Sequence, residues 1–288
     1  MASHVVYGSD FDREFTNGNL ALERFTYRFL VEGDSWMDRS SPLQSSLPWA
    51  LADRFDEAGE SALFINLAQF GDTMRRMGET AGGEFAGWVQ RGFHWPFDAI
   101  LLSAAGNDFI DAARDPAAGQ GILAQIAPGA AAAASVDDCL RNDAIQLLVD
   151  SYLNPNFAVL HNMVRTSQDQ SDVPLFLNCY DVPTARRAGV VRNRDAWLYA
   201  AYTKNGTPEG LWPGVTQRIF GAVSDTVAGW ARQRDGVFTV PTVGSLDPAQ
   251  PKATGSSGDW LNEIHLNKSG WKKLARVWFD RLYPVVKK

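Results

Sequence analysis

The sequence is poor in cysteine: Cys139 and Cys179 are the only two in 288 residues. No Cys-x-x-Cys pair is present, which excludes the common zinc and dithiol motifs. Cys139 falls in an expected helix and Cys179 in an expected strand, so both are interpreted as small buried apolar side chains. A chain of this length can bury enough apolar surface to fold without disulfides.

Long hydrophobic runs are also missing. The best candidate, residues 99–105, lies between Asp98 and Asn107 and is far too short to cross a bilayer. The N-terminus has no basic segment followed by an apolar stretch, so no Sec signal peptide is predicted. The expected location is the cytoplasm, with export by a non-Sec route or a trimmed leader left open.

Clusters of basic residues and several well-known ligand motifs are absent as well. The formal net charge is −6 and no basic run exceeds two residues, which argues against nucleic acid as a partner. There is no Gly-x-Gly-x-x-Gly after the first strand, no P-loop, no His-Glu-x-x-His and no calcium loop, so no cofactor or metal is predicted. The Gly-x-Ser-x-Gly elbow of ordinary α/β-hydrolases is missing too.

What the sequence does contain is a regular alternation of strands and helices. Short β-branched and aromatic runs predict five strands, at 26–31, 62–67, 97–103, 173–180 and 237–240. Helical spacing of apolar residues between and after them predicts helices at 47–58, 73–90, 137–166, 213–232 and 268–286, the second interrupted at Gly82-Gly83 and the third broken at Pro155. This order predicts one α/β domain over residues 1–288, with a parallel sheet and helices on both faces.

One segment between the fourth strand and the next helix departs from the alternation. Residues 182–212 contain Trp197, Tyr199, Tyr202 and Trp212 among glycines and prolines. Such an aromatic insertion is interpreted in two equally weighted ways, as a segment that covers the substrate or as a packed surface excursion.

Four short blocks stand at the ends of predicted strands. They are Gly33-Asp-Ser-Trp36, Asn66 to Asp72, Gly106-Asn-Asp108 and Asp259 to Gly270. Ligands of parallel α/β sheets bind beyond the carboxyl ends of the strands, which is where all four blocks fall. Each block alone is common, but their order and shared location are hard to obtain by chance.

In these blocks the sequence resembles the SGNH hydrolases, also called the GDSL family of serine esterases and lipases. The resemblance covers about residues 26–280. It implies a flavodoxin-like three-layer α/β/α sandwich with a five-stranded sheet. It also implies that Ser35 is the nucleophile, that Ser35, Gly71 and Asn107 form the oxyanion hole, and that His265 is the general base.

The chemistry of these residue types agrees with that assignment. A serine hydroxyl needs an adjacent base to become a nucleophile, and His265 can accept its proton and return it to the leaving group. Backbone N–H groups of Ser35 and Gly71, with the side-chain amide of Asn107, could stabilise the oxyanion. The sequence therefore predicts cleavage of a small-molecule or lipid ester through an acyl-enzyme.

The third member of the triad departs from the family pattern. The position three residues before His265 is usually an aspartate, and here it is Asn262. An amide oxygen can orient the imidazole. Asn262 is favoured because its position relative to His265 matches the family pattern, with Asp259 as the alternative and Glu263 as the least favoured.

Trp36, directly after the nucleophile, is expected either to line an acyl pocket or to pack under the following loop. Three functional readings stay open: an esterase or lipase-like hydrolase, an acyl hydrolase or acyltransferase acting on phospholipids or acetylated glycans, and a catalytically weak ligand-binding relative. The oligomeric state is not predicted.

Overall fold

A parallel sheet forms the centre of the computed structural model, which describes residues 2–38, 45–79, 83–91, 96–115, 121–126, 135–190 and 196–288. Within these residues the sheet has six strands in the order β1-β3-β2-β4-β5-β6, and all neighbouring strands are parallel. The strands are β1 (His4–Tyr7), β2 (Tyr27–Gly33), β3 (Ala62–Asn66), β4 (Ala99–Ser103), β5 (Leu175–Asn178) and β6 (Val237–Val240).

The predicted fold class is confirmed, but the predicted number of strands is wrong. All five expected strands are present, and β1 adds a sixth at the edge of the sheet. This strand has only four residues and is followed at once by a helix, so it carries little periodicity of its own. It pairs with β3, with Val5 opposite Phe64, and this tertiary pairing makes the segment a strand.

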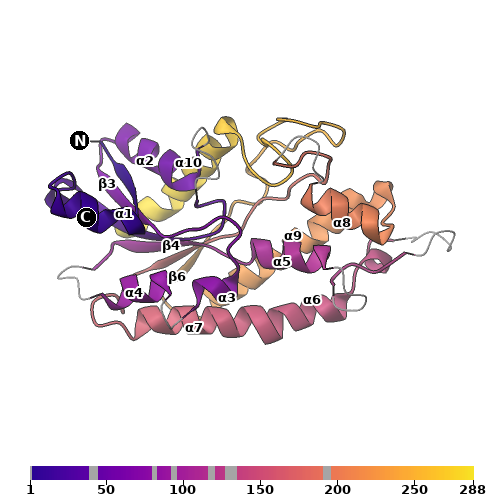
Figure 1. The fold of residues 1–288 in the computed structure, drawn as a ribbon, viewed down its shortest axis with the longest axis horizontal. Coiled ribbons are helices and arrows are strands. Elements are labelled where there is room, and N and C mark those ends of the chain that lie inside the picture. The colour runs from indigo at the N-terminus through magenta and orange to yellow at the C-terminus, as the bar shows by residue number, and fades with distance from the viewer. Residues whose placement is uncertain are drawn as a thin grey trace.

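Helices cover both faces of the sheet (Figure 1). On one face α2 packs against α10 and β3, and on the other α9 packs against β5 and β6. The helices are α1 (Gly8–Thr16), α2 (Leu47–Glu57), α3 (Met74–Met77), α4 (Glu84–Gln90), α5 (Gly106–Arg114), α6 (Asn142–Leu148), α7 (Asn154–Arg165), α8 (Trp197–Asn205), α9 (Trp212–Arg232) and α10 (Lys268–Val286). No helix in the described ranges is long and apolar enough to span a membrane.

The helix expected over residues 137–166 is divided. It consists of α6, a π-helical segment over Val149–Leu153, and α7, preceded by one 3₁₀ turn. Pro155 lies just after the π segment, and because the chain is already helical before it, its missing N–H removes one hydrogen bond from a continuous helix. The π segment takes up the irregularity just before this proline.

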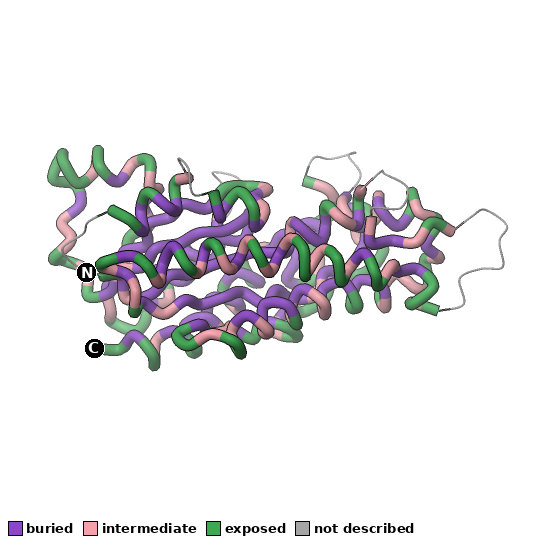
Figure 2. Tube along the Cα trace, turned by 90° about the horizontal axis from the view of Figure 1, so that it is seen from below, coloured by how far each residue is buried: buried purple, intermediate pink, exposed green. Residues whose placement is uncertain are grey.

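The core lies within and beside the sheet, as the buried residues in Figure 2 show. Every residue of β3 and β4 is buried, which suits strands that are covered on both faces. β2 runs between these two strands and ends at Gly33, beside Ser103 of β4. Gly33 has φ 152°, and a Cβ there would lie 2.7 Å from the carbonyl oxygen of Ser103. A glycine is thus required at the point where the chain leaves β2.

Candidate active site

Ser35 lies in a tight turn directly after β2. The Asp34 carboxylate accepts a hydrogen bond from the backbone N–H of Trp36 at 3.0 Å, and the Met37 N–H donates to the Asp34 carbonyl at 3.0 Å. These local bonds are typical of an aspartate that shapes a turn. Because the turn follows a central strand, Ser35 is held at the carboxyl edge of the sheet with only 4% of its surface exposed.

The structure places His265 beside Ser35, although 230 positions separate them in the sequence. The Nε2 atom of His265 lies 2.8 Å from the Ser35 Oγ atom, and Nδ1 lies 3.1 Å from the Asn262 Oδ1 atom. Three side chains thus form a chain of hydrogen bonds from amide to imidazole to hydroxyl.

The orientation of the Asn262 amide is fixed by its neighbours. Its Oδ1 atom also accepts hydrogen bonds from the backbone N–H groups of Ile264, at 3.1 Å, and His265, at 2.8 Å. An NH₂ group in that place could not accept from two N–H donors, so the oxygen must face His265. The proton of His265 then belongs on Nδ1, which leaves the Nε2 lone pair for the Ser35 hydroxyl.

Asp259, the alternative orienting residue, is engaged elsewhere. Its carboxylate accepts from the backbone N–H of Asp247 and from the Lys273 ammonium, both at 2.7 Å. Glu263 also points away from the imidazole. Of the three residues considered from the sequence, the structure brings Asn262 to His265.

His265 is almost completely buried, with 2% of its surface exposed. Phe70 stacks on its ring at a centroid distance of 5.8 Å, and Trp197 meets it edge-on at 5.5 Å. This burial lowers the pKa of His265 to about 4, because the imidazolium is poorly solvated there. The ring is therefore neutral near neutral pH, as a general base has to be.

The two other oxyanion candidates belong to one hydrogen-bonded unit. Gly71 follows β3 and has φ +80°, a conformation that favours glycine. The loop that carries it is joined to the end of β2, because the Gln69 N–H donates to the Gly33 carbonyl at 3.0 Å. Asn107, in the first turn of α5, donates from its amide to the carbonyl of Asp72 at 2.9 Å.

A buried polar network lies beneath Ser35 and was not anticipated from the sequence. The Tyr180 hydroxyl donates to Asp34 at 2.5 Å, and Ser103 donates to the same carboxylate at 3.0 Å. Burial raises the pKa of Asp34 to about 6, although these donors and the Trp36 N–H oppose the rise. Tyr180 itself has φ 55°, which is uncommon for a residue with a side chain. No local pattern near Asp34 pointed to this distant tyrosine.

Glu263 connects the loop of His265 to the aromatic insertion. Its fully buried carboxylate accepts from the backbone N–H groups of Arg186 at 3.0 Å, and of Leu198 and Tyr199, both at 2.8 Å. The last two are in the first turn of α8, where a helix favours a negative charge. Burial raises the pKa of Glu263 to about 7, against these backbone donors.

Arg186 strengthens the same connection from the other side. Its guanidinium donates to the carbonyls of Asn262 at 2.6 Å, Ala253 at 2.9 Å and Gly255 at 2.5 Å. The described parts of the insertion, 182–190 and 196–212, are thus joined to the loop that carries Asn262 and His265. Through this connection Trp197 is placed against the imidazole.

Glu32, at the end of β2, is a fully buried carboxyl that predicts a pH-dependent stability. Burial raises its pKa to about 8, opposed by the Gly33 N–H and assisted by the charges of Asp72 and Glu84. The pKa in the unfolded chain is near 4.5, so unfolding releases a proton between these values. The contribution of Glu32 to the free energy of unfolding is therefore greatest below about pH 4.5. It falls by up to about 5 kcal/mol as the pH rises to about 8.

Glu32→Gln should remove this part of the pH dependence, because a glutamine side chain does not ionise. Urea unfolding at pH 5 and pH 8 measures the change in the free energy of unfolding between the two. We expect a clearly smaller drop in the variant than in the wild type, and an unchanged drop in Glu23→Gln, an exposed control. Equal drops in all three proteins would contradict the assignment.

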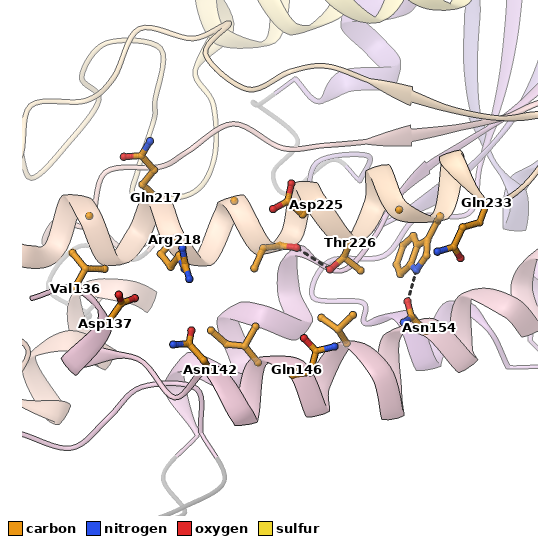
Figure 3. Close-up of a pocket in the computed structure, with 17 residues that line it drawn as sticks. Val136, Asp137, Asn142, Gln146, Asn154, Gln217, Arg218, Asp225, Thr226 and Gln233 are labelled. Carbon is orange, nitrogen blue, oxygen red and sulfur yellow. Dashed lines mark hydrogen bonds between the residues drawn. The ribbon is translucent and has the colours of Figure 1, made fainter.

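Two pockets differ sharply in their chemistry. A small pocket of about 290 Å³ opens beside Ser35 and Asn107. A larger groove, which Ser35 does not line, lies between α9 and the α6–α7 segment (Figure 3). No serine, cysteine or histidine is among its described lining residues, and its Thr226 hydroxyl donates to the Ala222 carbonyl. The small pocket is the one that adjoins a hydroxyl with a base.

Comparison with known proteins finds similar folds among solved structures. No family model and no curated protein sequence matches the chain. Among solved structures, a lipase from a goat rumen metagenome matches with a TM-score of 0.54 and 9% identity, over 89% of this chain and 97% of that one. A family 3 carbohydrate esterase from Clostridium thermocellum has a TM-score of 0.48 and 15% identity, over 91% and 97%. An acetyl xylan esterase from Geobacillus stearothermophilus has a TM-score of 0.43 and 12% identity, over 90% and 95%.

The likeness to the lipase extends over nearly the full length of both chains. With the parallel sheet and its covering helices, it confirms the predicted α/β/α sandwich, which is the fold that the resemblance in the sequence implies. The resemblance noted in the sequence is therefore confirmed at the level of the fold, and the chemistry rests on the residues of the site.

Proposed function

We propose that this protein is a serine-dependent hydrolase of carboxylic esters that works through an acyl-enzyme. The observation that carries the proposal is the chain of hydrogen bonds from Asn262 through His265 to Ser35, with distances of 3.1 and 2.8 Å. A base within hydrogen-bond reach of a hydroxyl, itself oriented by a third group, is the arrangement that nucleophilic catalysis requires.

In the first step, the Ser35 oxygen attacks the ester carbonyl carbon and its proton passes to Nε2 of His265. The carbonyl π electrons move to the oxygen, which becomes an oxyanion. When the intermediate collapses, the bond to the leaving alcohol breaks and Nε2 returns the proton to that oxygen. Water then repeats both steps on the acyl-enzyme and releases the carboxylic acid.

The oxyanion is assigned to the backbone N–H groups of Ser35 and Gly71 and the side-chain amide of Asn107. An amide nitrogen carries two protons, so Asn107 can hold the Asp72 carbonyl with one and an oxyanion with the other. Fixing Asn107 in this way preorganises the donor, and loss of one such donor typically lowers kcat about 10²- to 10³-fold.

The proposal is tested by reacting the purified protein with a small fluorophosphonate and with p-nitrophenyl acetate. An activated serine forms a covalent phosphonyl adduct, which mass spectrometry of peptides should place on Ser35. Turnover of the ester should disappear in parallel with labelling. Labelling at another residue, or an unlabelled protein without turnover, would refute the proposed function.

A further inference from the structure

The pocket beside Ser35 is built for a group without polar atoms. Its remaining walls are the side chains of Trp36, Ile110, Pro183, Phe220, Trp260 and Ile264. The polar heads of Asp34 and Tyr180 also reach it, but they are bonded to each other and to Ser103. A ligand group in this pocket therefore finds apolar contacts and few free hydrogen-bonding partners.

The position of the pocket identifies which part of an ester would enter it. Ser35 and Asn107 both line it, so it adjoins the places assigned to the carbonyl carbon and the oxyanion. His265 does not line it, and the imidazole has to face the leaving alcohol to return the proton. The group that extends into the pocket is therefore the alkyl part of the acyl group.

The wall that closes the pocket is rigid. The indole N–H of Trp36 donates to the carbonyl of Ile264 at 3.1 Å, which prevents free rotation of the ring. The same ring meets Tyr180 and Trp260 edge-on, at centroid distances of 5.0 and 6.2 Å. All three side chains are at most 4% exposed. Displacing Trp36 would break these contacts together, so a longer pocket would require a large unfavourable free energy.

The space inside this wall is small. The space in it that admits a water-sized group is only about 10 Å³, about what one water molecule needs. The total of about 290 Å³ of empty space also includes the solvent at the mouth of the pocket. A methyl group fits such a space, and a long alkyl chain does not.

We propose that the enzyme is selective for esters of very short acyl groups, acetyl above all, and that Trp36, Ile110 and Phe220 set this limit. The inference rests on the proposed function, because it assigns the acyl part of the same reaction. Extra methylene groups would have to displace buried side chains, which are packed as densely as an organic crystal.

The test compares kcat/KM for p-nitrophenyl acetate, butyrate and octanoate. In the wild type we expect acetate to exceed octanoate by about 100-fold or more, since a single misfitting methylene is worth ~10-fold or more. Phe220→Ala and Ile110→Ala enlarge the pocket from two different helices, α9 and α5. Each should raise the ratio of butyrate to acetate by about tenfold.

Val223→Ala is the matched control, because Val223 is equally buried on α9 but does not line the pocket. It should leave the butyrate-to-acetate ratio unchanged. The inference is overturned if the wild type hydrolyses octanoate as well as acetate, or if neither enlarging variant moves the ratio beyond the control. Fluorophosphonate labelling of Ser35 separates the two possible failures. If Ser35 is labelled, only the assignment of the acyl length is wrong. If Ser35 is not labelled, the proposed function is wrong as well.

Discussion

Ser35→Ala is expected to lower kcat for p-nitrophenyl acetate by about 10⁴-fold or more, to a residual rate supplied by the oxyanion hole and substrate binding. The Ser35 hydroxyl lies 2.8 Å from Nε2 of His265. Among the described residues, no other hydroxyl is hydrogen-bonded to that nitrogen. Steady-state kinetics at pH 7 measure the loss.

Two controls separate this result from unfolding. Ser151→Ala removes an exposed hydroxyl of the π-helical segment and should keep full activity. The double variant Ser35→Ala/His265→Gln should be no slower than Ser35→Ala alone, because residues that act as one unit are not additive. Full activity in a folded Ser35→Ala protein would mean that the hydrogen-bonded chain is not the catalytic one.

Asn262→Ala is expected to lower kcat by about 10²- to 10⁴-fold, comparable to losses in triads whose histidine is held in the wrong tautomer. Without the Asn262 oxygen, Nδ1 of His265 has no acceptor and the proton can move to Nε2, where it blocks the transfer from Ser35. The backbone N–H groups of Ile264 and His265 also lose their acceptor, so stability should fall as well. Urea unfolding separates this loss from the loss of kcat.

Asn262→Asp tests the same contact from the opposite direction. A carboxylate there would favour the imidazolium, so it should raise the pKa of His265 from about 4. Because the base must be neutral, the acid limb of the profile of kcat/KM against pH should move to higher pH. Asp259→Asn is the matched control, and its acid limb should stay in place. If the limb moves with Asp259 and not with Asn262, the orienting role belongs to Asp259.

The sequence predicted the architecture because the strands carry their own pattern. The nearly apolar run of β4 and the helical spacing of α2, α9 and α10 are local features, and their elements appear close to the expected bounds. β1 is different, because its four residues become a strand only when β3 offers them an edge. Its pairing is a property of the folded sheet.

The site shows the same division. Ser35, Gly71, Asn107, Asn262 and His265 were found through short motifs at strand ends, and their roles remain proposals. The Tyr180 hydroxyl under Asp34 and the backbone donors around Glu263 were missed. Both involve partners more than 60 positions away, whose approach depends on packing between layers.

The buried contacts of Glu263 and Arg186 have a consequence for anyone redesigning the substrate range. Trimming residues 182–212 would remove the three backbone N–H groups that Glu263 accepts from. Its carboxyl, whose pKa burial already raises to about 7, would be left without those partners beside the loop of Asn262 and His265. Transplanting that loop without the insertion would create the same defect. The two segments form a single interchangeable module, and a chimera with another sandwich of this type would have to exchange both together.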